Sequence, residues 1–194
     1  MSKLSQLYDR NGERKYLNAT EREAFLNALD GSLTAHQIAL CSLLLFTGCR
    51  ISEALSLTPN SLEKDDRTVV FKTLKQRGNK TFRAVPIPQE ILNKLDELAT
   101  AIPAEKQIWQ VSRMTAWRLV KKIMARASIE GIKATPKGLR HGFAIACVTN
   151  GVPLPILQKW LGHARLETTS IYLDFVGEDE RNIARKVWKA TSRI

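Results

Sequence analysis

Hydrophobic positions along the chain follow two different spacings. From residue 20 to residue 57 they recur at the three- and four-residue intervals typical of amphipathic helices, which predicts helices at 20–29, 34–48 and 52–57. A capping box formed by Thr20 and Glu23 is expected to open the first helix, and Gly48 to close the second. The second helix is apolar on most sides and is therefore expected at the centre of the core.

Between residues 61 and 87 the spacing changes to short runs rich in Val, Phe and Thr. Runs 68–74 and 81–87 predict a β-hairpin with a long basic tip, flanked by a short strand at 61–63. Helical spacing then returns at 88–99, 113–128, 136–149, 153–161, 166–175 and 178–191. We therefore predict one mainly α-helical domain with a small antiparallel sheet (α+β) at residues 20–194, preceded by a flexible lead-in at 1–19.

The charge of the chain indicates a polyanionic partner. The formal net charge is +11, although the hydrophobic and charged fractions of 44% and 25% are those of an ordinary soluble globular protein. Nucleic acid is the commonest polyanion, whereas an anionic membrane would call for a basic amphipathic helix or a polybasic block beside an apolar anchor. The sequence shows neither such a helix nor such a block. Apolar runs such as 38–46 are too short to span a bilayer, and the first residues lack the apolar core of a signal peptide.

Cysteine usage indicates a reducing compartment. Cys41, Cys49 and Cys147 are scattered, form no metal-ligand spacing and cannot all pair with one another. A cytoplasmic location is the simplest expectation. Cys49 stands beside an arginine but is interpreted as a small buried thiol.

Three runs carry residues suited to chemistry on a phosphodiester: Thr47–Glu53 with Arg50, Pro136–His141 with Arg140, and Leu161–Tyr172 with His163. Taken singly, Arg50 could be a surface charge after a helix cap, His163 a capping imidazole and Tyr172 a core residue. A phenol among fixed cations is nevertheless what attack on a phosphate diester needs, because the transition state gains charge on its non-bridging oxygens.

In their order and spacing these runs resemble the phage integrase, or tyrosine recombinase, family over roughly residues 20–175. The resemblance implies the catalytic-domain fold of that family and a DNA-cutting activity that needs neither metal, ATP nor any other cofactor. It makes Tyr172 the nucleophile that forms a 3′-phosphotyrosyl link. Arg50, Arg140 and His163 would then bind the non-bridging oxygens of the phosphate.

Two lysines complete the implied catalytic set. The family places a general-acid lysine at the end of a hairpin strand, which corresponds to Lys75, with Lys72 as the alternative on the opposite face. Lys137 stands where a histidine is more common in the family, which leaves the identity of the proton acceptor open. Thr135 and Pro136 are expected to cap and begin the helix beside it. His141 is interpreted as a structural histidine inside that helix.

The resemblance also implies double-stranded DNA as partner. The helix at 113–128 is expected to bury a stripe containing Met114, Trp117, Val120, Met124 and Ala127, and to turn its basic face to DNA. The expected DNA-contacting residues are Arg77, Lys80, Arg83, Arg113, Arg118, Lys121, Lys122 and Arg126. Further expected partners are three other protomers in a synaptic tetramer and accessory DNA-bending proteins.

Several alternatives remain open from sequence alone. Only about twenty residues precede the catalytic region, so we expect a single-domain form, without a separate N-terminal core-binding domain, similar to the short fimbrial-type invertases. A fragment and an accessory protein are the alternatives. The last helix could dock on its own core or on a neighbouring protomer. Integration, excision and inversion are equally compatible with the motifs. The rival functions are nicking and closing of DNA, as by type IB topoisomerases, and DNA-binding regulation without catalysis.

Overall fold

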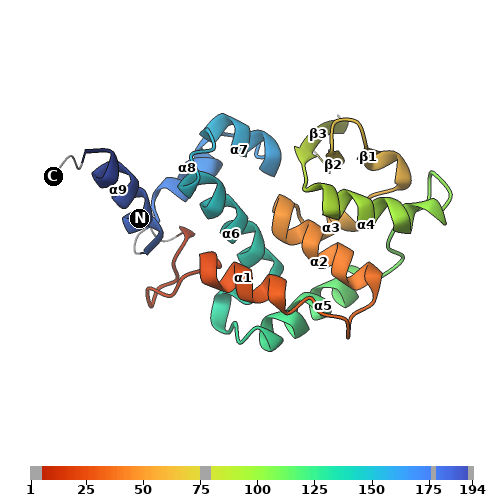
Figure 1. Ribbon diagram of the computed structural model, residues 1–194, viewed down its shortest axis with the longest axis horizontal. Helices are drawn as coiled ribbons and strands as arrows, with labels where there is room; N and C mark the ends of the chain where they lie inside the picture. Colours follow the sequence, from red (N-terminus) through yellow and green to blue (C-terminus); the bar gives the residue numbers. More distant parts are fainter. Residues whose placement is uncertain (1–5, 75–79, 176–177, 192–194) are drawn as a thin grey trace.

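The computed structural model describes residues 6–74, 80–175 and 178–191 (Figure 1). The predicted class is confirmed, because helices dominate and the strands form a small antiparallel sheet in the order β1-β2-β3. The elements, with η for 3₁₀-helices, are α1 (Ala19–Asn27), α2 (Ala35–Thr47), α3 (Ile51–Leu55), η2 (Pro59–Ser61), β1 (Leu62–Glu63), β2 (Thr68–Leu74), β3 (Lys80–Pro86), α4 (Gln89–Thr100), α5 (Arg113–Arg126), η3 (Gly131–Lys133), α6 (Pro136–Thr149), α7 (Leu154–Leu161), α8 (Glu167–Ser170), η4 (Ile171–Leu173) and α9 (Glu178–Thr191).

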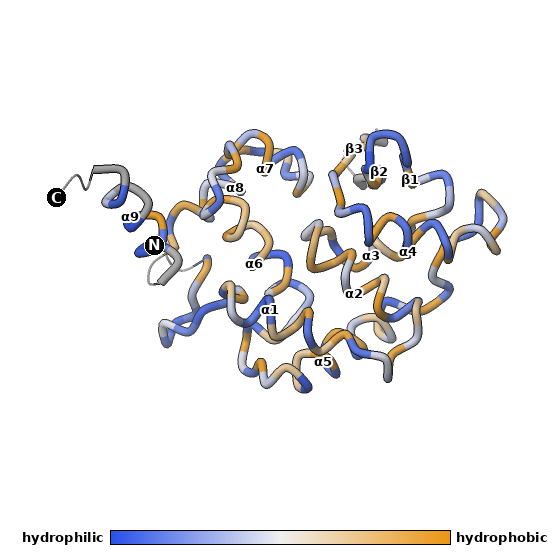
Figure 2. Tube along the Cα trace, in the orientation of Figure 1, coloured by the Kyte–Doolittle hydropathy of each residue, from blue (hydrophilic) through white to orange (hydrophobic). Residues whose placement is uncertain are grey.

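Helices α2 and α6 pack against each other in the middle of the molecule, with the sheet towards one end and α9 at the other (Figure 1). Most of α2 is hydrophobic (Figure 2), and its run from Ala39 to Leu45 is fully buried, as predicted. One core cluster joins α2 to α4, α5 and the sheet. A second joins α6, α7 and η4, so the candidate nucleophile lies in its own small apolar cluster.

The end of α2 is set by Gly48, which caps the helix in the left-handed region at φ +60°. A Cβ at this position would lie 2.6 Å from Cδ1 of Phe143 on α6, so both the backbone conformation and the packing require glycine. The predicted cap is confirmed. Because the chain turns sharply here, Arg50 follows at the first position before α3.

The N-terminal segment differs from the flexible lead-in that was predicted for residues 1–19. Leu7, Tyr16 and Leu17 have no exposed surface, and Tyr8 pairs with Arg14 in a β-bridge. The predicted capping box is also displaced, because Asn18 and Glu21, rather than Thr20 and Glu23, exchange the capping hydrogen bonds of α1. Apolar residues spaced too irregularly to indicate an element are nevertheless buried by the core.

Three smaller features relate to the predictions made from the sequence. The predicted helix at 166–175 is divided into α8 and η4, so Tyr172 lies on a 3₁₀ turn. Within the described ranges, no helix has the length and apolar character needed to cross a bilayer. All three cysteines are buried, and burial raises the pKa of Cys49 to about 12, as befits the inert thiol that was expected.

Candidate active site in a basic cleft

A cleft of about 1040 Å³ lies where the N-terminal segment, the α2–α3 junction and the beginnings of α5 and α6 meet η4. Its lining includes five of the six predicted catalytic residues, namely Arg50, Lys137, Arg140, His163 and Tyr172. Residues more than a hundred positions apart in the chain are thus brought to one cavity. Lys75, the sixth, lies outside the described residues.

Arg50 is held at the mouth of the cleft by its own helix. Its backbone amide donates to Glu53 Oε2 at 2.8 Å, and its Nη1 donates to Glu53 Oε1 at 2.9 Å. The side chain remains 48% exposed, so the rest of the guanidinium group faces solvent. This arrangement fixes the direction of Arg50 while leaving it able to bind an anion.

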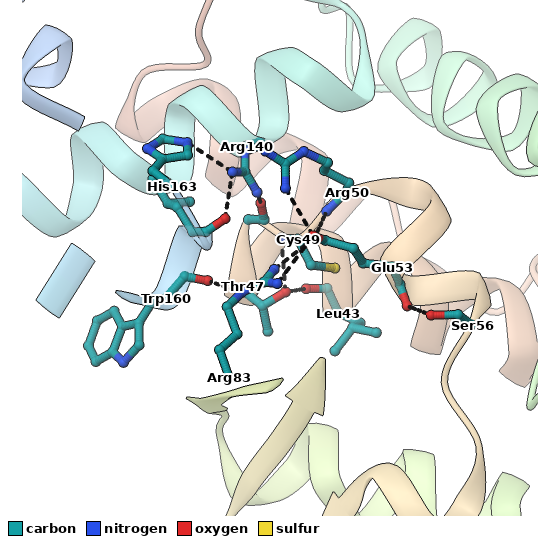
Figure 3. A network of polar contacts seen from close by, with 12 residues as sticks. Leu43, Thr47, Cys49, Arg50, Glu53, Ser56, Arg83, Arg140, Trp160 and His163 are labelled. Carbon is teal, nitrogen blue, oxygen red and sulfur yellow. Dashed lines mark hydrogen bonds and ion pairs between the residues drawn. The ribbon is translucent and has the colours of Figure 1, made fainter. Parts of the chain in front are cut away.

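Arg140 is buried on α6 and ties three chain segments together (Figure 3). Its Nη1 donates to the Gly48 carbonyl, and its Nη2 donates to the Leu161 carbonyl, both at 2.7 Å. Its Nη2 also lies 3.0 Å from His163 Nε2. Burial and then the charge of Arg50 lower the pKa of Arg140 to about 10, which still leaves a cation at neutral pH.

His163 has a defined tautomer in this network. Arginine can only donate, so His163 Nε2 must accept from Arg140, and its Nδ1–H therefore donates to Thr169 Oγ1 at 2.9 Å. Burial, followed by the charges of Arg140 and Arg50, lowers the pKa of His163 to about 3. The ring is neutral, and Gly162, at φ +66°, ends α7 immediately before it.

Tyr172 is almost completely buried, with 1% of its surface exposed. Its ring stacks on His163, with centroids 6.3 Å apart and an interplanar angle of 13°. Burial raises the pKa of Tyr172 to about 12, although Arg140 and Arg50 act in the opposite direction. The phenol is therefore protonated in this structure.

His141 is the residue that sequence reasoning placed outside the site. Its Nδ1 lies 2.9 Å from the hydroxyl oxygen of Tyr172, and the ring is buried. Burial, followed by the charges of Lys137, Arg140 and Lys15, lowers its pKa to about 4. The interpretation of His141 as a merely structural residue missed this contact, because no local pattern indicates that η4 folds back onto α6.

The beginning of α6 also forms part of the cleft wall. Thr135 caps the helix by accepting from the Gly138 amide at 3.1 Å, and Pro136 is the first helical residue, as predicted. Lys137 is exposed and reaches the cleft from the first turn. The ammonium group of Lys137 thus faces the same cavity as the two arginines.

The prediction that Arg83 contacts DNA is wrong for this structure. Arg83 pairs with Phe71 across the hairpin and faces inward, where it is 6% exposed. Its Nη1 and Nη2 donate to Glu53 at 3.1 and 2.7 Å, and its Nε donates to the Trp160 carbonyl at 2.8 Å (Figure 3). Strand alternation turns this side chain towards the core, where a buried carboxylate receives it.

Glu53 therefore lies between two arginines. Burial alone would raise the pKa of Glu53, but hydrogen bonds and charge from Arg83, together with Arg50, bring it below its ordinary value. A buried carboxylate paired in this way remains ionised. The result is a rigid link from the hairpin through α3 to Arg50.

Of the two alternative hairpin lysines, Lys72 lies within the described residues. Lys72 is exposed and pairs with Phe82, on the sheet face opposite to that of Phe71 and Arg83. It therefore points away from the face that contacts Glu53. Arg77 lies outside the described residues, as Lys75 does, and Lys80 is placed as the first residue of β3.

Helix α5 has a basic exposed face, but its buried stripe was predicted in part wrongly. Val120 and Met124 are buried as expected, while Met114 and Trp117 are 56% and 39% exposed and Ala127 is half-buried. Ala116 and Ile123 complete the buried stripe instead. Among the predicted DNA-contacting residues of α5, Arg113, Arg118, Lys122 and Arg126 are exposed and Lys121 is half-buried.

Two of these basic residues, Arg113 and Arg126, lie in different surroundings at the two ends of α5. Arg113 lines the cleft, so the basic face of α5 continues into the cavity that holds Arg50. Arg126 forms an ion pair with Asp30 and donates to Ser32 Oγ at 2.8 Å, at the far end of the helix. The nearer end of α5 is therefore the part that shares a surface with the cleft.

A family model described as "Phage integrase family" matches residues 15–176. Tyrosine recombinase XerC of Caldanaerobacter subterraneus subsp. tengcongensis is 30% identical over 169 residues, covering 81% of this chain and 46% of the relative. A resolvase of Escherichia coli is 30% identical over 191 residues, covering 81% of this chain and 70% of the relative. The chain thus spans about half the length of the first of these relatives.

Solved structures share the fold. XerH recombinase in a post-cleavage complex with palindromic difH substrate has a TM-score of 0.75 at 23% identity, covering 93% of this chain and 56% of that chain. The catalytic domain of bacteriophage HP1 integrase has a TM-score of 0.65 at 24% identity, covering 89% of this chain and 95% of that chain. At these identities the likeness extends to the fold alone.

Proposed function

The chain belongs to the phage integrase family, and we propose that it is a site-specific DNA recombinase that cuts and rejoins DNA through a 3′-phosphotyrosyl intermediate. The observation that carries the proposal is the convergence of Tyr172, Arg50, Arg140 and His163 on one basic cleft. Integration, excision and inversion of a DNA segment would all use this chemistry.

In the proposed reaction the hydroxyl oxygen of Tyr172 attacks the scissile phosphorus and the 5′-oxygen leaves. Arg50 and Arg140 bind the non-bridging oxygens, whose charge grows in the transition state. Arg50 has the exposure to reach a strand at the cleft mouth, and Arg140 lies deeper. His163 orients Arg140 through Nε2. As the third phosphate ligand it would carry its hydrogen on Nε2, and Nδ1 would then accept from the Thr169 hydroxyl.

Burial of Tyr172 requires one further step. With 1% of its surface exposed, the phenol cannot meet a phosphorus atom until the cleft beside α6 and η4 opens. We expect DNA binding to supply the free energy for this opening, because a phosphate attracts Arg140 more strongly than its two carbonyl partners do and also binds the exposed part of Arg50. The free protein is thereby kept from cutting DNA at random.

Proton transfers at the leaving group are assigned to lysine. Lys75 is proposed as the general acid that protonates the 5′-oxygen, since Lys72 lies on the sheet face opposite to the one that contacts Glu53. Lys137 is proposed as a phosphate ligand rather than a proton acceptor, because it is exposed among cations. Lys137→Ala should then impair cleavage strongly, whereas Lys137→His should retain much of it.

The proposed chemistry needs no metal and no nucleotide. The phosphotyrosyl bond conserves the energy of the broken phosphodiester, so a 5′-hydroxyl can reverse the reaction. Fixed guanidinium groups supply the charge stabilisation that Mg²⁺ supplies in many phosphoryl transfers.

Double-stranded DNA is the proposed partner. XerH has been solved bound to difH substrate, and in the present structure Arg113 joins the basic face of α5 to the cleft. Strand exchange would require four protomers on two sites, and accessory DNA-bending proteins could assist their assembly. Most contacts from α5 would be made to phosphates and would weaken steeply with salt.

A covalent-capture experiment tests the proposal. The protein is incubated with a randomised library of nicked duplexes, in which cleavage releases a short 5′-hydroxyl oligonucleotide that diffuses away. A covalent protein–DNA adduct is expected with the wild type and not with Tyr172→Phe, and sequencing the trapped DNA gives the site.

The same experiment separates the two rival functions. An adduct accompanied by relaxation of supercoiled DNA, but by no strand exchange between two captured sites, would indicate a topoisomerase-like nicking and closing enzyme. DNA binding without an adduct on any sequence would contradict the recombinase proposal and indicate a regulator.

A further inference from the structure

The contact between His141 and Tyr172 is not used by the mechanism above, yet it involves the reacting oxygen itself. The two residues are 31 positions apart, both are buried, and His141 Nδ1 lies 2.9 Å from the Tyr172 hydroxyl. Arg140 precedes His141 on the same helix, so the phosphate ligand and the tyrosine contact are set by one rigid element. This is more than the packing of a core histidine.

A phenol that attacks phosphorus must lose its proton, and few groups near Tyr172 can accept one. Lys137 is a cation without a lone pair, and both arginines are charged at neutral pH. His163 is already committed on both ring nitrogens, because Nε2 accepts from Arg140 and Nδ1–H donates to Thr169. Among the described residues, the hydrogen-bond partner of the hydroxyl is His141.

We propose that His141 is the proton acceptor of the nucleophile, an inference that rests on the proposed recombinase function. As the bond from the Tyr172 oxygen to phosphorus forms, the hydroxyl proton passes to Nδ1 and the imidazole becomes an imidazolium. The bond from phosphorus to the 5′-oxygen breaks, and that oxygen takes a proton from the general acid. On rejoining, the 5′-hydroxyl attacks phosphorus and gives its proton back to the general acid. The phenolate leaves, and Nδ1 returns its proton to the Tyr172 oxygen.

The tautomer that this role requires is available. Nδ1 can accept only if the neutral ring carries its hydrogen on Nε2, and His141 Nε2 is buried with no hydrogen-bond partner in the part of the chain that the structure describes. No hydrogen-bond acceptor therefore stabilises the imidazolium from the far side. A proton received from Tyr172 is held weakly and can be returned, as a reversible reaction needs.

The charges around His141 make its basicity depend on bound DNA. Burial, followed by the charges of Lys137, Arg140 and Lys15, lowers the pKa of His141 to about 4, while burial raises the pKa of Tyr172 to about 12. The proton therefore stays on the phenol in the free protein. A phosphate bound among these cations offsets their charge, so His141 becomes more basic only when a substrate is present.

The His141→Gln variant tests whether position 141 must accept a proton or only a hydrogen bond. His141→Gln can keep an oxygen near the Tyr172 hydroxyl but cannot be protonated, so we expect adduct formation on the captured DNA to slow by about 100-fold or more. Binding of the same DNA should be unchanged. His36→Gln, on the exposed first turn of α2, is the matched control and should cleave like the wild type.

A more acidic nucleophile supplies the decisive comparison. Replacing Tyr172 by difluorotyrosine through unnatural amino-acid incorporation makes the phenol easier to deprotonate, so it should restore most of the rate that His141→Gln loses. A variant that is slow because it is misfolded would not be rescued in this way. Nitrogen NMR of the wild type adds a test without activity, since Nδ1 of His141 should carry no proton in the free protein.

The outcomes distinguish this inference from the proposed function. Wild-type cleavage together with unimpaired His141→Gln would overturn the role of His141 and leave the recombinase intact. Equal slowing with tyrosine and with difluorotyrosine, or a protonated Nδ1 in the free wild type, would likewise overturn proton acceptance. If the wild type forms no adduct on any DNA, the proposed function fails and this inference fails with it.

Discussion

Replacing Arg83 by methionine tests whether this arginine supports the site from inside or contacts DNA. The change keeps much of the side-chain length against the Phe71 ring, over which the guanidinium carbon lies 5.0 Å from the centroid. It removes both hydrogen bonds to Glu53 and the one to the Trp160 carbonyl. Glu53, whose side chain is 7% exposed, then keeps only Arg50 as a charged partner within the described part of the chain.

The structure indicates a large loss of stability. Removing one partner of a buried ion pair leaves an incompletely compensated charge and typically costs about 3–5 kcal/mol. Because both side chains of the Arg83–Glu53 pair are at most 7% exposed, we expect Arg83→Met to lie within that range. The Lys64–Asp96 pair, with the same 2.7 Å separation but side chains 63% and 36% exposed, provides the control. Lys64→Met should cost less than about 1 kcal/mol.

Urea denaturation at neutral pH measures both variants, with the midpoint and the slope fitted separately. The pH dependence gives a second observable. In the wild type the pKa of Glu53 is lowered, so its contribution to stability is complete above 4.5, its ordinary value, and is lost as pH falls through the lower folded value. Without Arg83, burial raises the pKa of Glu53, so Glu53 becomes protonated at a higher pH and the uncompensated buried charge is lost. The difference in unfolding free energy between the variant and the wild type should therefore narrow in acid.

Two measurements on Arg83→Met, its stability and the salt dependence of its DNA binding, distinguish a buried support from a DNA contact. If Arg83→Met unfolds within about 1 kcal/mol of the wild type, and the salt dependence of DNA binding becomes shallower, then Arg83 contacts phosphate and the buried pair does not govern its role. Loss of stability with an unchanged salt slope would support the internal role. Combining the change with Glu53→Gln should cost less than the sum of the two single changes, because the pair is in direct contact.

Three further predictions concern the geometry of the cleft. Gly48→Ala should destabilise the protein by about 1–3 kcal/mol from overpacking against Phe143, in addition to backbone strain at φ +60°, as measured by thermal unfolding; an unchanged midpoint would mean that α2 and α6 separate readily. Thr169→Val removes the hydrogen bond that orients His163, so it should slow cleavage by about tenfold and lower the unfolding free energy by about 1 kcal/mol. Full activity of this variant would show that the His163 ring needs no such support. Absorbance titration of tyrosinate should show a phenol with a pKa of about 12 that is absent from Tyr172→Phe. The contribution of Tyr172 to stability should be complete below pH 10 and should fall as pH rises towards 12. A titration midpoint near 10 would contradict the buried hydroxyl.

The sequence by itself determined the elements whose ends are set by neighbouring residues. Thr34 and Gly48 bound α2, Thr135 and Pro136 begin α6, and the run Thr68–Leu74 forms β2 as predicted. In each case a cap, a turn or a two-residue alternation acts over a few positions, so local spacing contains the necessary information. The motif residues at the cleft could likewise be named in advance, because the family resemblance orders them along the chain.

Only the tertiary structure decided which charged and polar groups meet. Arg83 belongs to a basic hairpin by sequence, but its partner Glu53 lies 30 positions away, and the contact of His141 with Tyr172 spans 31 positions. Leu7, similarly, is buried by elements that follow it far along the chain. Such contacts depend on how whole elements pack, and the low-dielectric interior that packing creates then fixes which groups stay charged. The local spacing of residues predicts neither the packing nor its effect on proton affinity.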